Sequence, residues 1–459
     1  MPGTRNGIVL SPIDELLCAM PGIPETIGVA ALFAGEPPHP DELRARVAGR
    51  WGGLPRLRRA LLRPEGPAAR LRPHRWLPLE RFDPGRQVLD AGETAEDGPA
   101  DDTADDTADD TGGPGDADLT GLLGRLVARP LPDGLPPWRL RLVRRAGAGR
   151  FALVLTAHHA LLDGRSLEIL LSRLLDGDPG RGGRPGGGVR EVRALRAAHP
   201  DDAQGSAHAR PRVPLGPGRA LPLPAGAAAR PETAWTEVDP AAVRAARRAL
   251  PGLGATLNEV LLAAATGALR AVHGPPHRWP GAPRPLFGTF PVDLRTPDGA
   301  RELGNVVSVV RVPLPADADG PAERLAACRG LLAAHGPLGG ADPAARLVGT
   351  AARLGPWALR LLAARAAAPG QAPVACMAVR WPRGPWFLDG RPMERVIPLP
   401  PVQAPGTAGF ALTDCGGTYT LGVVSHTLPG HARLLADAFG RELAAHVRRP
   451  AEALSGPTR

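Results

Sequence analysis

The sequence predicts an α/β protein with two domains. Its 459 residues exceed the roughly 250–300 residues that a single hydrophobic core usually supports. Hydrophobic residues make up 43% of the chain, which is enough for packed cores. Apolar runs of strand length and segments with helical periodicity both recur along the chain, so strands and helices contribute together.

The first predicted domain covers residues 1–175. A helix begins at Pro12 with Ser11 as its N-cap, and turn residues at 146–149 join two strands into a hairpin. After this first helix we expect, in order, a strand at 27–33, a helix at 40–49, a helix at 119–128, and strands at 136–143 and 151–157. Residues 93–118 are acidic and repetitive, so we predict a disordered surface insertion there.

The second strand of the hairpin leads directly into His158-His159-Ala160-Leu161-Leu162-Asp163-Gly164. Because the preceding run has strand length and no breaker, it is typical of a buried central strand. Histidine titrates at a pKa of about 6.5, so its neutral form can take a proton from a hydroxyl or an amine. Two histidines carried out of the core on a rigid strand therefore indicate a positioned general base.

Other interpretations of these residues stay open. Adjacent histidines at a strand end can be structural, and Asp163 can simply cap the next helix. Metal binding is a further alternative, but neighbouring strand residues point to opposite faces, and no Cys or His pair at ligand spacing lies nearby. We therefore predict neither a metal nor a cofactor.

The segment 176–233 is rich in Gly, Pro and Arg, and we interpret it as the connection between the domains. One short helix is expected within it, at 189–198. The composition otherwise favours a linker over a packed element.

The second predicted domain covers residues 234–459. Thr256 and Glu259 match a capping box at the start of an apolar helix over 260–272, which we expect to be deeply buried. Asn258 and Glu259 therefore have a structural interpretation at least as good as a catalytic one. Further strands are expected at 303–315 and 418–424, and a terminal helix at 429–447.

Charge and composition exclude some partners. The net charge is +9, but the arginines are spread along the chain and there is one Tyr, so we expect no nucleic acid. A basic surface would suit an acidic ligand or an anionic membrane face. Four scattered cysteines are typical of a reducing compartment, and neither a signal peptide nor a run of ~20 apolar residues is present. We predict a cytoplasmic protein, at most peripheral to a membrane or to lipid inclusions.

Several segments in a fixed order carry a resemblance. They are Leu10-Ser11-Pro12, Arg129-Pro130-Leu131 with Pro137-Trp138, residues 151–164, 254–260 and 291–295, and Gly304-Asn305 with 312–315. Together they resemble the bacterial wax ester synthase/diacylglycerol acyltransferase family. The His-His…Asp-Gly motif alone is shared with the chloramphenicol-acetyltransferase-like and condensation-domain superfamily, and its combination with the Thr256 and Gly304 segments points to the wax synthase branch.

The resemblance implies two chloramphenicol-acetyltransferase-like lobes, each a mixed sheet flanked by helices, with an active-site tunnel between them. It implies an O-acyltransferase that moves a long-chain acyl group from acyl-coenzyme A, as co-substrate, to a lipid alcohol or a diacylglycerol. His159 would be the general base. General base catalysis typically supplies about 10²–10⁴-fold, and holding both substrates in a dry channel would supply more.

The same resemblance implies roles for the neighbours of His159. His158 would position the base, and Gly164 would let the backbone turn sharply beside it. Asp163 would be structural and pair with Arg295, because a buried carboxylate needs such a partner. Asn258 would lie near the tunnel.

The chain also departs from the family pattern. A Ser-Asn-Val-Pro-Gly-Pro-like motif is replaced by Val379-Arg380-Trp381-Pro382-Arg383-Gly384-Pro385. An arginine and a tryptophan there could narrow or repolarise the acceptor channel. Two alternatives arise from this difference: a specialised natural-product acyltransferase that takes its donor from coenzyme A or a carrier protein, and a catalytically degenerate homologue that binds acyl chains.

Overall fold

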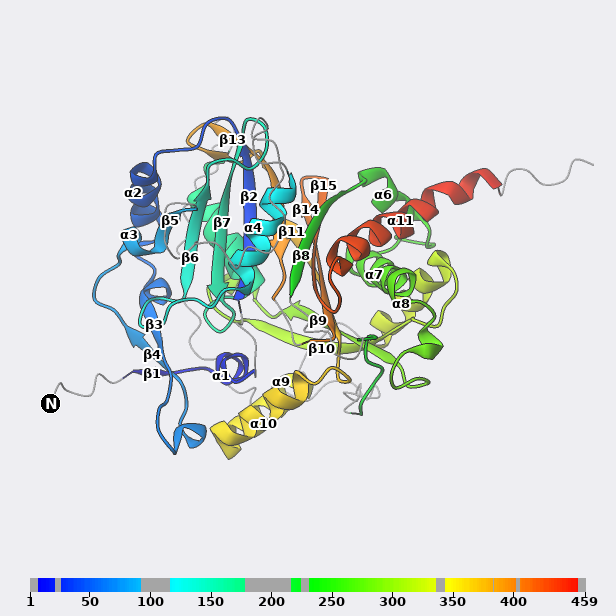
Figure 1. Ribbon diagram of the computed structural model, residues 1–459, viewed down its shortest axis with the longest axis horizontal. Coiled ribbons are helices and arrows are strands. Elements are labelled where there is room, and N and C mark those ends of the chain that lie inside the picture. Colours follow the sequence, from blue (N-terminus) through cyan, green and yellow to red (C-terminus); the bar gives the residue numbers. More distant parts are fainter. Residues whose placement is uncertain are drawn as a thin grey trace, which may run out of the picture.

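The computed structural model describes residues 7–20, 26–91, 116–177, 216–223, 231–335, 343–382, 384–401 and 405–452. Within these ranges the chain forms two six-stranded sheets and one small three-stranded sheet. The two large sheets define two lobes, with helices packed on their faces (Figure 1). The predicted α/β class and its two lobes are confirmed.

The first lobe is built on a mixed sheet in the order β12-β13-β2-β7-β6-β5. Its strands are β12 (Phe387–Leu388), β13 (Arg391–Leu399), β2 (Thr26–Ala34), β7 (Arg150–His158), β6 (Trp138–Val143) and β5 (Val88–Asp90). β6 and β7 form the predicted antiparallel hairpin, and β2 pairs along all of β7, with Thr26 opposite His158.

The two faces of this sheet bury different clusters. Alternate residues of β2 point in opposite directions, so Val29 packs with α2 (Pro40–Trp51) and α5 (Gly164–Leu174). Ala30, on the other face, packs with α4 (Asp116–Ala128) and with residues of the second lobe. The first sheet is therefore covered on both faces.

The second lobe has the strand order β10-β9-β11-β14-β15-β8. These strands are β10 (Val307–Leu314), β9 (Leu286–Asp293), β11 (Val374–Trp381), β14 (Thr407–Cys415), β15 (Thr418–His426) and β8 (Glu232–Val238). Four helices cover one face, namely α6 (Pro240–Arg248), α7 (Leu257–His273), α8 (Pro321–His335) and α11 (His431–Glu452) (Figure 1).

One strand of the first sheet comes from residues 234–459, the segment that was expected to form the second domain alone. β13 lies far along the chain, yet it pairs antiparallel with β2 of the first sheet. It also passes over β15, where the Pro398 carbonyl oxygen would lie 1.9 Å from a Cβ built on Gly422. Only a residue without a side chain allows this close approach of two backbones.

Much of the predicted acidic insertion and of the predicted connection between the domains lies outside the described residues. These parts are 92–115 of the acidic insertion, and 178–215 and 224–230 of the connection, including the helix expected at 189–198. Helix α4 begins at Asp116, so the last three residues of the segment 93–118 are helical. β8 begins at Glu232, inside the segment assigned to the connection.

The remaining helices, strands and turns of the described chain are mostly smaller. They are β1 (Ile8–Val9), β3 (Arg59–Leu62) and β4 (Arg75–Pro78) in the small sheet, the helices α1 (Pro12–Cys18), α3 (Pro84–Gln87), α9 (Pro343–Leu354) and α10 (Pro356–Ala366), and the 3₁₀ turns η1 (Pro55–Arg58), η2 (Ala69–Leu71), η6 (Pro276–Arg278) and η7 (Pro297–Gly299). α1 packs against α9 and α10 through Leu16. Among the helices of the described ranges, none combines the length and apolar character that crossing a membrane requires.

Candidate active site

The two histidines lie where the central strand of the first lobe ends. β7 is buried from Phe151 to Ala157, and His158, its last residue, is half-buried. The chain then turns tightly, because the Leu161 amide donates to the His158 carbonyl at 2.8 Å. The following leucines enter the core, which fixes the loop that carries the histidines.

His158 is held neutral and in one orientation. Its Nδ1 accepts a hydrogen bond from the Ala160 amide at 3.1 Å, and its own amide donates to the Pro137 carbonyl at 2.9 Å. Desolvation, together with Arg63 and the neighbouring histidines, lowers the pKa of His158 to about 3. Since Nδ1 accepts a proton donor, the ring proton lies on Nε2. This imidazole contributes position and no charge at neutral pH.

His159 differs in that its backbone is fixed while its ring is not. The Asn305 amide nitrogen donates to the His159 carbonyl at 2.7 Å. Its Nδ1 is buried and has no hydrogen-bond partner in the described part of the chain. An imidazole on a fixed backbone, whose Nδ1 no described residue engages, can act as a general base toward a bound group.

Asn305 and Arg56 together hold the turn after the histidines. Asn305 Nδ2 also lies 3.2 Å from the Ala160 carbonyl oxygen. Arg56 donates from Nη2 to the same oxygen at 3.2 Å and from Nε to the Leu161 carbonyl at 2.5 Å. Three consecutive carbonyl groups are thereby occupied by two side chains, which come from distant parts of the sequence.

Asp14 of α1 accepts hydrogen bonds from both of these side chains. Its Oδ1 accepts from Asn305 Nδ2 at 2.7 Å, and its Oδ2 accepts from Arg56 Nη2 at 3.2 Å. The side chains of Asp14 and Arg56 are each 5% exposed. A buried ion pair is stable only when hydrogen bonds compensate for the loss of hydration of both charges. α1 is therefore connected to the His159 loop through a continuous set of hydrogen bonds.

Asp163 is both a helix cap and one half of an ion pair. Its Oδ1 accepts from the Ser166 amide at 2.7 Å, as the N-cap of α5, and from Arg295 Nη2 at 2.9 Å. Its Oδ2 accepts from the Val306 amide at 3.1 Å. Burial alone would lower the pKa of Arg295, but the Asp163 and Asp293 carboxylates outweigh it and raise that pKa above its usual value. The Asp163–Arg295 ion pair links the first lobe to the residues that follow β9.

Gly164 does not make the sharp turn that was expected of it. It is the first residue of α5, its φ is not in the left-handed region, and a Cβ built on it would meet no atom within 4 Å. The tight turn lies earlier, at residues 158–161. What Gly164 provides is open space at the start of α5, beside the histidine loop.

Asn258 lies in the first turn of α7. The capping box around it is confirmed: the Glu259 amide donates to Thr256 Oγ1 at 3.2 Å, and the Thr256 amide donates to Glu259 Oε2 at 2.6 Å. Asn258 itself is half-buried and makes no hydrogen bond to the histidine loop within the described ranges. Its place near a tunnel stays a prediction.

In the altered segment around Trp381, some side chains lie on the surface and others in the core. The Arg380 side chain is 70% exposed and lies 3.8 Å from Asp414, whereas Trp381 is 2% exposed and packs in the first-lobe core that also contains Ala160. Arg383 is outside the described residues. The tryptophan thus fills part of the first-lobe core.

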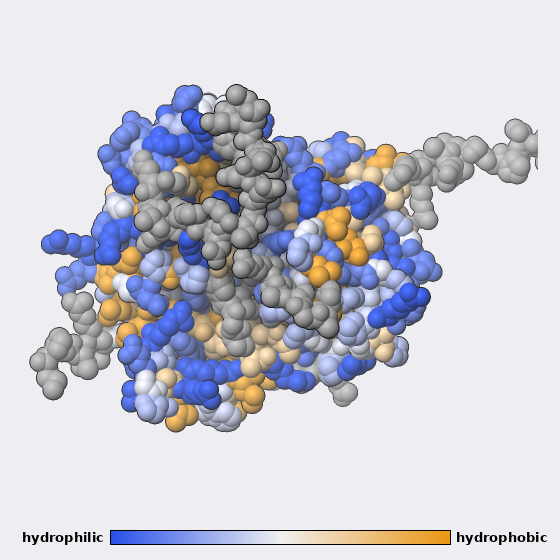
Figure 2. Space-filling model, viewed as in Figure 1, coloured by the Kyte–Doolittle hydropathy of each residue, from blue (hydrophilic) through white to orange (hydrophobic). Residues whose placement is uncertain are grey.

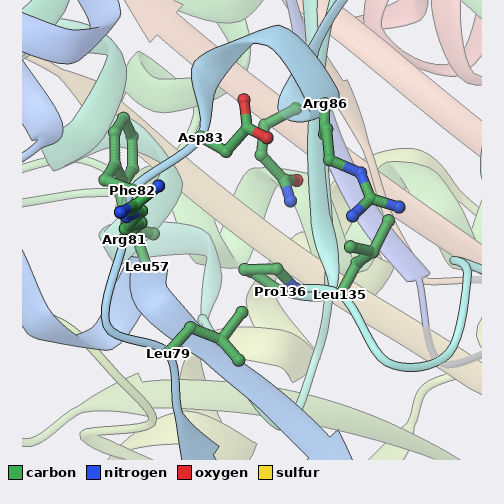
Figure 3. A pocket seen from close by; sticks show the side chains of 9 residues that line it. Leu57, Leu79, Arg81, Phe82, Asp83, Arg86, Leu135 and Pro136 are labelled. Carbon is green, nitrogen blue, oxygen red and sulfur yellow. The ribbon is translucent and has the colours of Figure 1, made fainter.

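A cavity of about 220 Å³ lies in the first lobe, and no residue of the histidine loop is among those that line it (Figure 3). Its walls are Leu57, Leu79, Arg81, Phe82, Asp83, Arg86, Gln87, Leu135 and Pro136. Two of these residues are chain neighbours of groups already described: Leu57 follows Arg56, and Pro136 precedes Pro137. In the described part of the chain no group of three or more His, Cys, Asp or Glu residues could hold a metal ion.

Sequence reasoning missed Asp14, Arg56 and the specific contacts of Asn305. It also missed Ser166, whose Oγ donates to the Gly304 carbonyl at 3.0 Å. Asp14 stands in the first turn of a short helix, where an acidic residue already has a local explanation. Arg56 is one of many arginines. Asn305 was noticed only as part of a segment. No local pattern singles them out, because their partners lie far away in the chain.

Comparisons with known proteins match most of the chain. The model of the wax ester synthase/diacylglycerol acyltransferase catalytic domain matches residues 112–270, and that of the WS/DGAT C-terminal domain matches residues 303–445. A Mycobacterium tuberculosis protein assigned by name as a diacylglycerol O-acyltransferase is 27% identical over 348 residues, which span 66% of this chain and 66% of that protein. A second M. tuberculosis protein so assigned is 30% identical over 240 residues, which span 45% of this chain and 50% of that one.

Solved structures show the same fold. The wax ester synthase/diacylglycerol acyltransferase of Marinobacter aquaeolei VT8 superposes with a TM-score of 0.61 at 20% identity, covering 96% of this chain and 98% of that one. The first condensation domain of the CDA synthetase superposes with a TM-score of 0.60 at 18% identity, covering 98% of each chain. The likeness to both confirms the two-lobed fold that was expected.

Proposed function

Because this chain belongs to the wax ester synthase/diacylglycerol acyltransferase family, we propose that it transfers a long-chain acyl group from coenzyme A to a lipid hydroxyl. The acceptor is a long-chain alcohol or a diacylglycerol, and the products are an ester and free coenzyme A. The relatives named as diacylglycerol O-acyltransferases support this substrate class. No metal and no cofactor take part in the proposed reaction.

One observation carries the proposal: His159 is fixed through its backbone carbonyl, while its ring nitrogen Nδ1 has no partner among the described residues. A purely structural histidine would have its ring nitrogens satisfied. The neighbouring imidazole of His158 is engaged and, with a pKa of about 3, stays neutral. Of the two, His159 is the one suited to exchange a proton with a substrate.

In the proposed mechanism His159 takes the proton of the acceptor hydroxyl as its oxygen attacks the thioester carbonyl carbon. A C–O bond forms, and the carbonyl electrons move to oxygen in a tetrahedral intermediate. When the carbonyl re-forms, the C–S bond breaks. The imidazolium returns its proton to the leaving thiolate, so the base is regenerated and charge is balanced.

The residues around His159 hold its position during these steps. Asn305 and Arg56 fix the loop carbonyls, and the Asp163–Arg295 pair fixes the start of α5. Such fixed geometry matters because a displacement of about 1 Å at a catalytic group can reduce the rate by about 10²-fold.

The test is thiol release from palmitoyl-coenzyme A with hexadecanol, a diacylglycerol or no acceptor. We expect acceptor-dependent release by the wild type and a loss of about 10²–10⁴-fold in His159→Ala. His277→Ala is the matched control, because His277 is exposed on η6 in the second lobe, and it should keep full turnover. Full turnover by His159→Ala would refute the proposal.

A parallel reaction with palmitoyl carried on an acyl carrier protein separates the donor classes. Faster transfer from the carrier than from coenzyme A would replace the proposed donor. Inactivity with both donors, in protein with an unchanged thermal unfolding transition, would favour a degenerate acyl-binding homologue.

A further inference from the structure

The cavity in the first lobe is larger than the voids of an ordinary protein core. Its volume is about 220 Å³, whereas most interiors contain few voids that exceed one water molecule. At the ~30 Å³ that a water molecule occupies in the liquid, the cavity has room for about seven such groups. It can therefore hold a small ligand.

Apolar side chains form most of the cavity walls, and Trp138 contacts two of them. The Leu57 carbonyl accepts from Trp138 Nε1 at 3.0 Å, and the Phe82 ring stacks on Trp138 with the ring centroids 6.0 Å apart. Trp138 itself is fully buried. Leu79, Leu135 and Pro136 complete the apolar lining. Such walls offer water few hydrogen bonds, so they favour an aliphatic occupant.

The cavity is separate from the site proposed for acyl transfer. Its described lining residues all lie between positions 57 and 136, in the first lobe. The tunnel that the family resemblance implies would lie between the two lobes, with His159 in it. A ligand in the cavity therefore need not displace either substrate.

Positive charge predominates where the cavity meets solvent. Arg81 and Arg86 both line the cavity and are exposed, and Figure 3 shows Phe82 on one side of it and Arg86 on the other. Within the described ranges neither arginine takes part in an ion pair. Asp83 is the one carboxylate among the described lining residues, and its Oδ1 lies 3.3 Å from a Cβ built on Gly85, at the start of α3. The two guanidinium groups outweigh this carboxylate, so the opening favours an anion.

Gln87 adds a hydrogen-bond donor inside the cavity. It is 2% exposed, yet it is one of the lining residues. Its Oε1 accepts from Arg139 Nη1 at 2.6 Å, and because a guanidinium can only donate, the amide oxygen must be on that side. The Gln87 Nε2 has no partner in the described part of the chain. A donor on a buried residue needs an acceptor, which a ligand with a free oxygen would supply.

We propose that the cavity binds a medium-chain carboxylate, with octanoate as the best fit. The seven carbons beyond the carboxyl group of octanoate match the about seven groups that the cavity can hold. The carboxylate lies at the opening, where Gln87 Nε2 donates to one oxygen and Arg81 and Arg86 offset the charge. Figure 2 shows hydrophobic side chains beside strongly hydrophilic ones at the left edge of the molecule, where α3 lies in Figure 1. This binding goes beyond the proposed acyl transfer and does not depend on it.

Isothermal titration calorimetry with hexanoate, octanoate, decanoate and 1-octanol tests the proposal on the intact chain. Each buried methylene should raise the affinity about fourfold, so octanoate should bind about 15-fold more tightly than hexanoate. Decanoate should gain less than about fourfold over octanoate, because the cavity is then full. 1-Octanol has a similar tail without the charge and should bind about tenfold more weakly than octanoate.

A double variant tests the charged contribution. Arg81→Gln with Arg86→Gln should weaken octanoate binding about tenfold and leave 1-octanol binding unchanged. The matched control is Arg244→Gln with Arg248→Gln, because these arginines are exposed on α6 of the second lobe. It removes the same charge and should bind octanoate like the wild type.

Further variants locate the ligand. Leu135→Trp and Leu79→Trp each place a larger side chain in the cavity and should lower the affinity for both ligands at least about tenfold. Gln87→Glu keeps an oxygen for Arg139 but loses the donor, so it should weaken octanoate binding and spare 1-octanol. His159→Ala should bind octanoate as the wild type does, since His159 is not among the lining residues. An unchanged thermal unfolding transition in each variant shows that the fold is retained.

Three outcomes would overturn the proposal. They are a wild type that binds octanoate no more tightly than hexanoate, equal affinity of the wild type for octanoate and 1-octanol, and folded cavity-filling variants that bind octanoate like the wild type. The last result would place the ligand elsewhere, including in the acyl-transfer site. None of these measurements requires turnover, so a failure of the proposed function remains distinguishable from a failure of this binding.

Discussion

Replacing Asn305 with alanine tests whether the distant contacts, and not the motif alone, position His159. The variant removes the donor to the His159 carbonyl at 2.7 Å and the donor to Asp14 Oδ1 at 2.7 Å. Losing a hydrogen bond to a buried charge costs about 1.5–3 kcal/mol, and leaving one buried carbonyl unsatisfied costs about 1–3 kcal/mol. The Ala160 carbonyl keeps its bond from Arg56. We therefore expect a loss of about 3–5 kcal/mol in the free energy of unfolding.

The expected effect on turnover is separate from that on stability. With its carbonyl released, His159 can move relative to the substrates, and we expect kcat to fall by about 10²-fold in the folded variant. Urea unfolding measures the first quantity, and thiol release from palmitoyl-coenzyme A below the unfolding transition measures the second. Asn258→Ala is the matched asparagine control and should cost less than about 0.5 kcal/mol.

Asn305→Asp tests the hydrogen-bond donor alone, because it keeps the shape of the side chain. It replaces the donor with a carboxylate facing Asp14, so it should be at least as destabilising as alanine at pH 7. If Asn305→Ala unfolds within about 0.5 kcal/mol of the wild type and turns over at the wild-type rate, the proposed fixation of His159 is wrong.

Three further predictions concern buried contacts. Arg295→Ala should destabilise the protein by about 3–5 kcal/mol, since it leaves the Asp163 carboxylate buried without its cation; urea unfolding that shifts by less than about 1 kcal/mol contradicts this. Burial raises the pKa of Glu168 from 4.5 to about 7, so the native protein keeps a proton that the unfolded chain has lost, and the wild type should lose up to about 3 kcal/mol of stability between pH 4.5 and pH 7. Glu168→Gln should not share that loss, and parallel pH profiles of unfolding for the two proteins would refute the assignment. Gly422→Ala should cost at least about 2–3 kcal/mol, because its Cβ would meet the Pro398 carbonyl, whereas Gly440→Ala, where a Cβ has open space within α11, should stabilise by about 0.5–1 kcal/mol.

Local patterns predicted the parts of the site that depend on nearby residues. The strand before His158 was visible as an apolar run without a breaker, and α5 was visible because Asp163 can cap a helix that begins at the next residue. The capping box of Thr256 and Glu259 was predicted for the same reason. Each of these features is determined within a few residues of chain, so one sequence contains enough information.

The contacts that fix the loop do not have local causes. Asn305 meets Asp14 across 291 positions of sequence and His159 across 146. Which asparagine approaches which carbonyl depends on how two lobes pack, and neither propensity nor periodicity contains that information. The addition of β13 to the first sheet was missed for the same reason, since its pairing partner lies more than 350 positions away.

The position of β13 has a consequence for how the protein is made. Synthesis of β2 and β7 is complete at residue 158, but the strand that completes the sheet beside β2 ends at Leu399, 241 residues later. At about 5–20 residues per second, the interval is roughly 10–50 s. During that time the edge of β2 lacks its native partner, and such edges pair readily with other chains. The edge of β2 in a nascent chain is therefore open to pairing with neighbouring chains until β13 has been made.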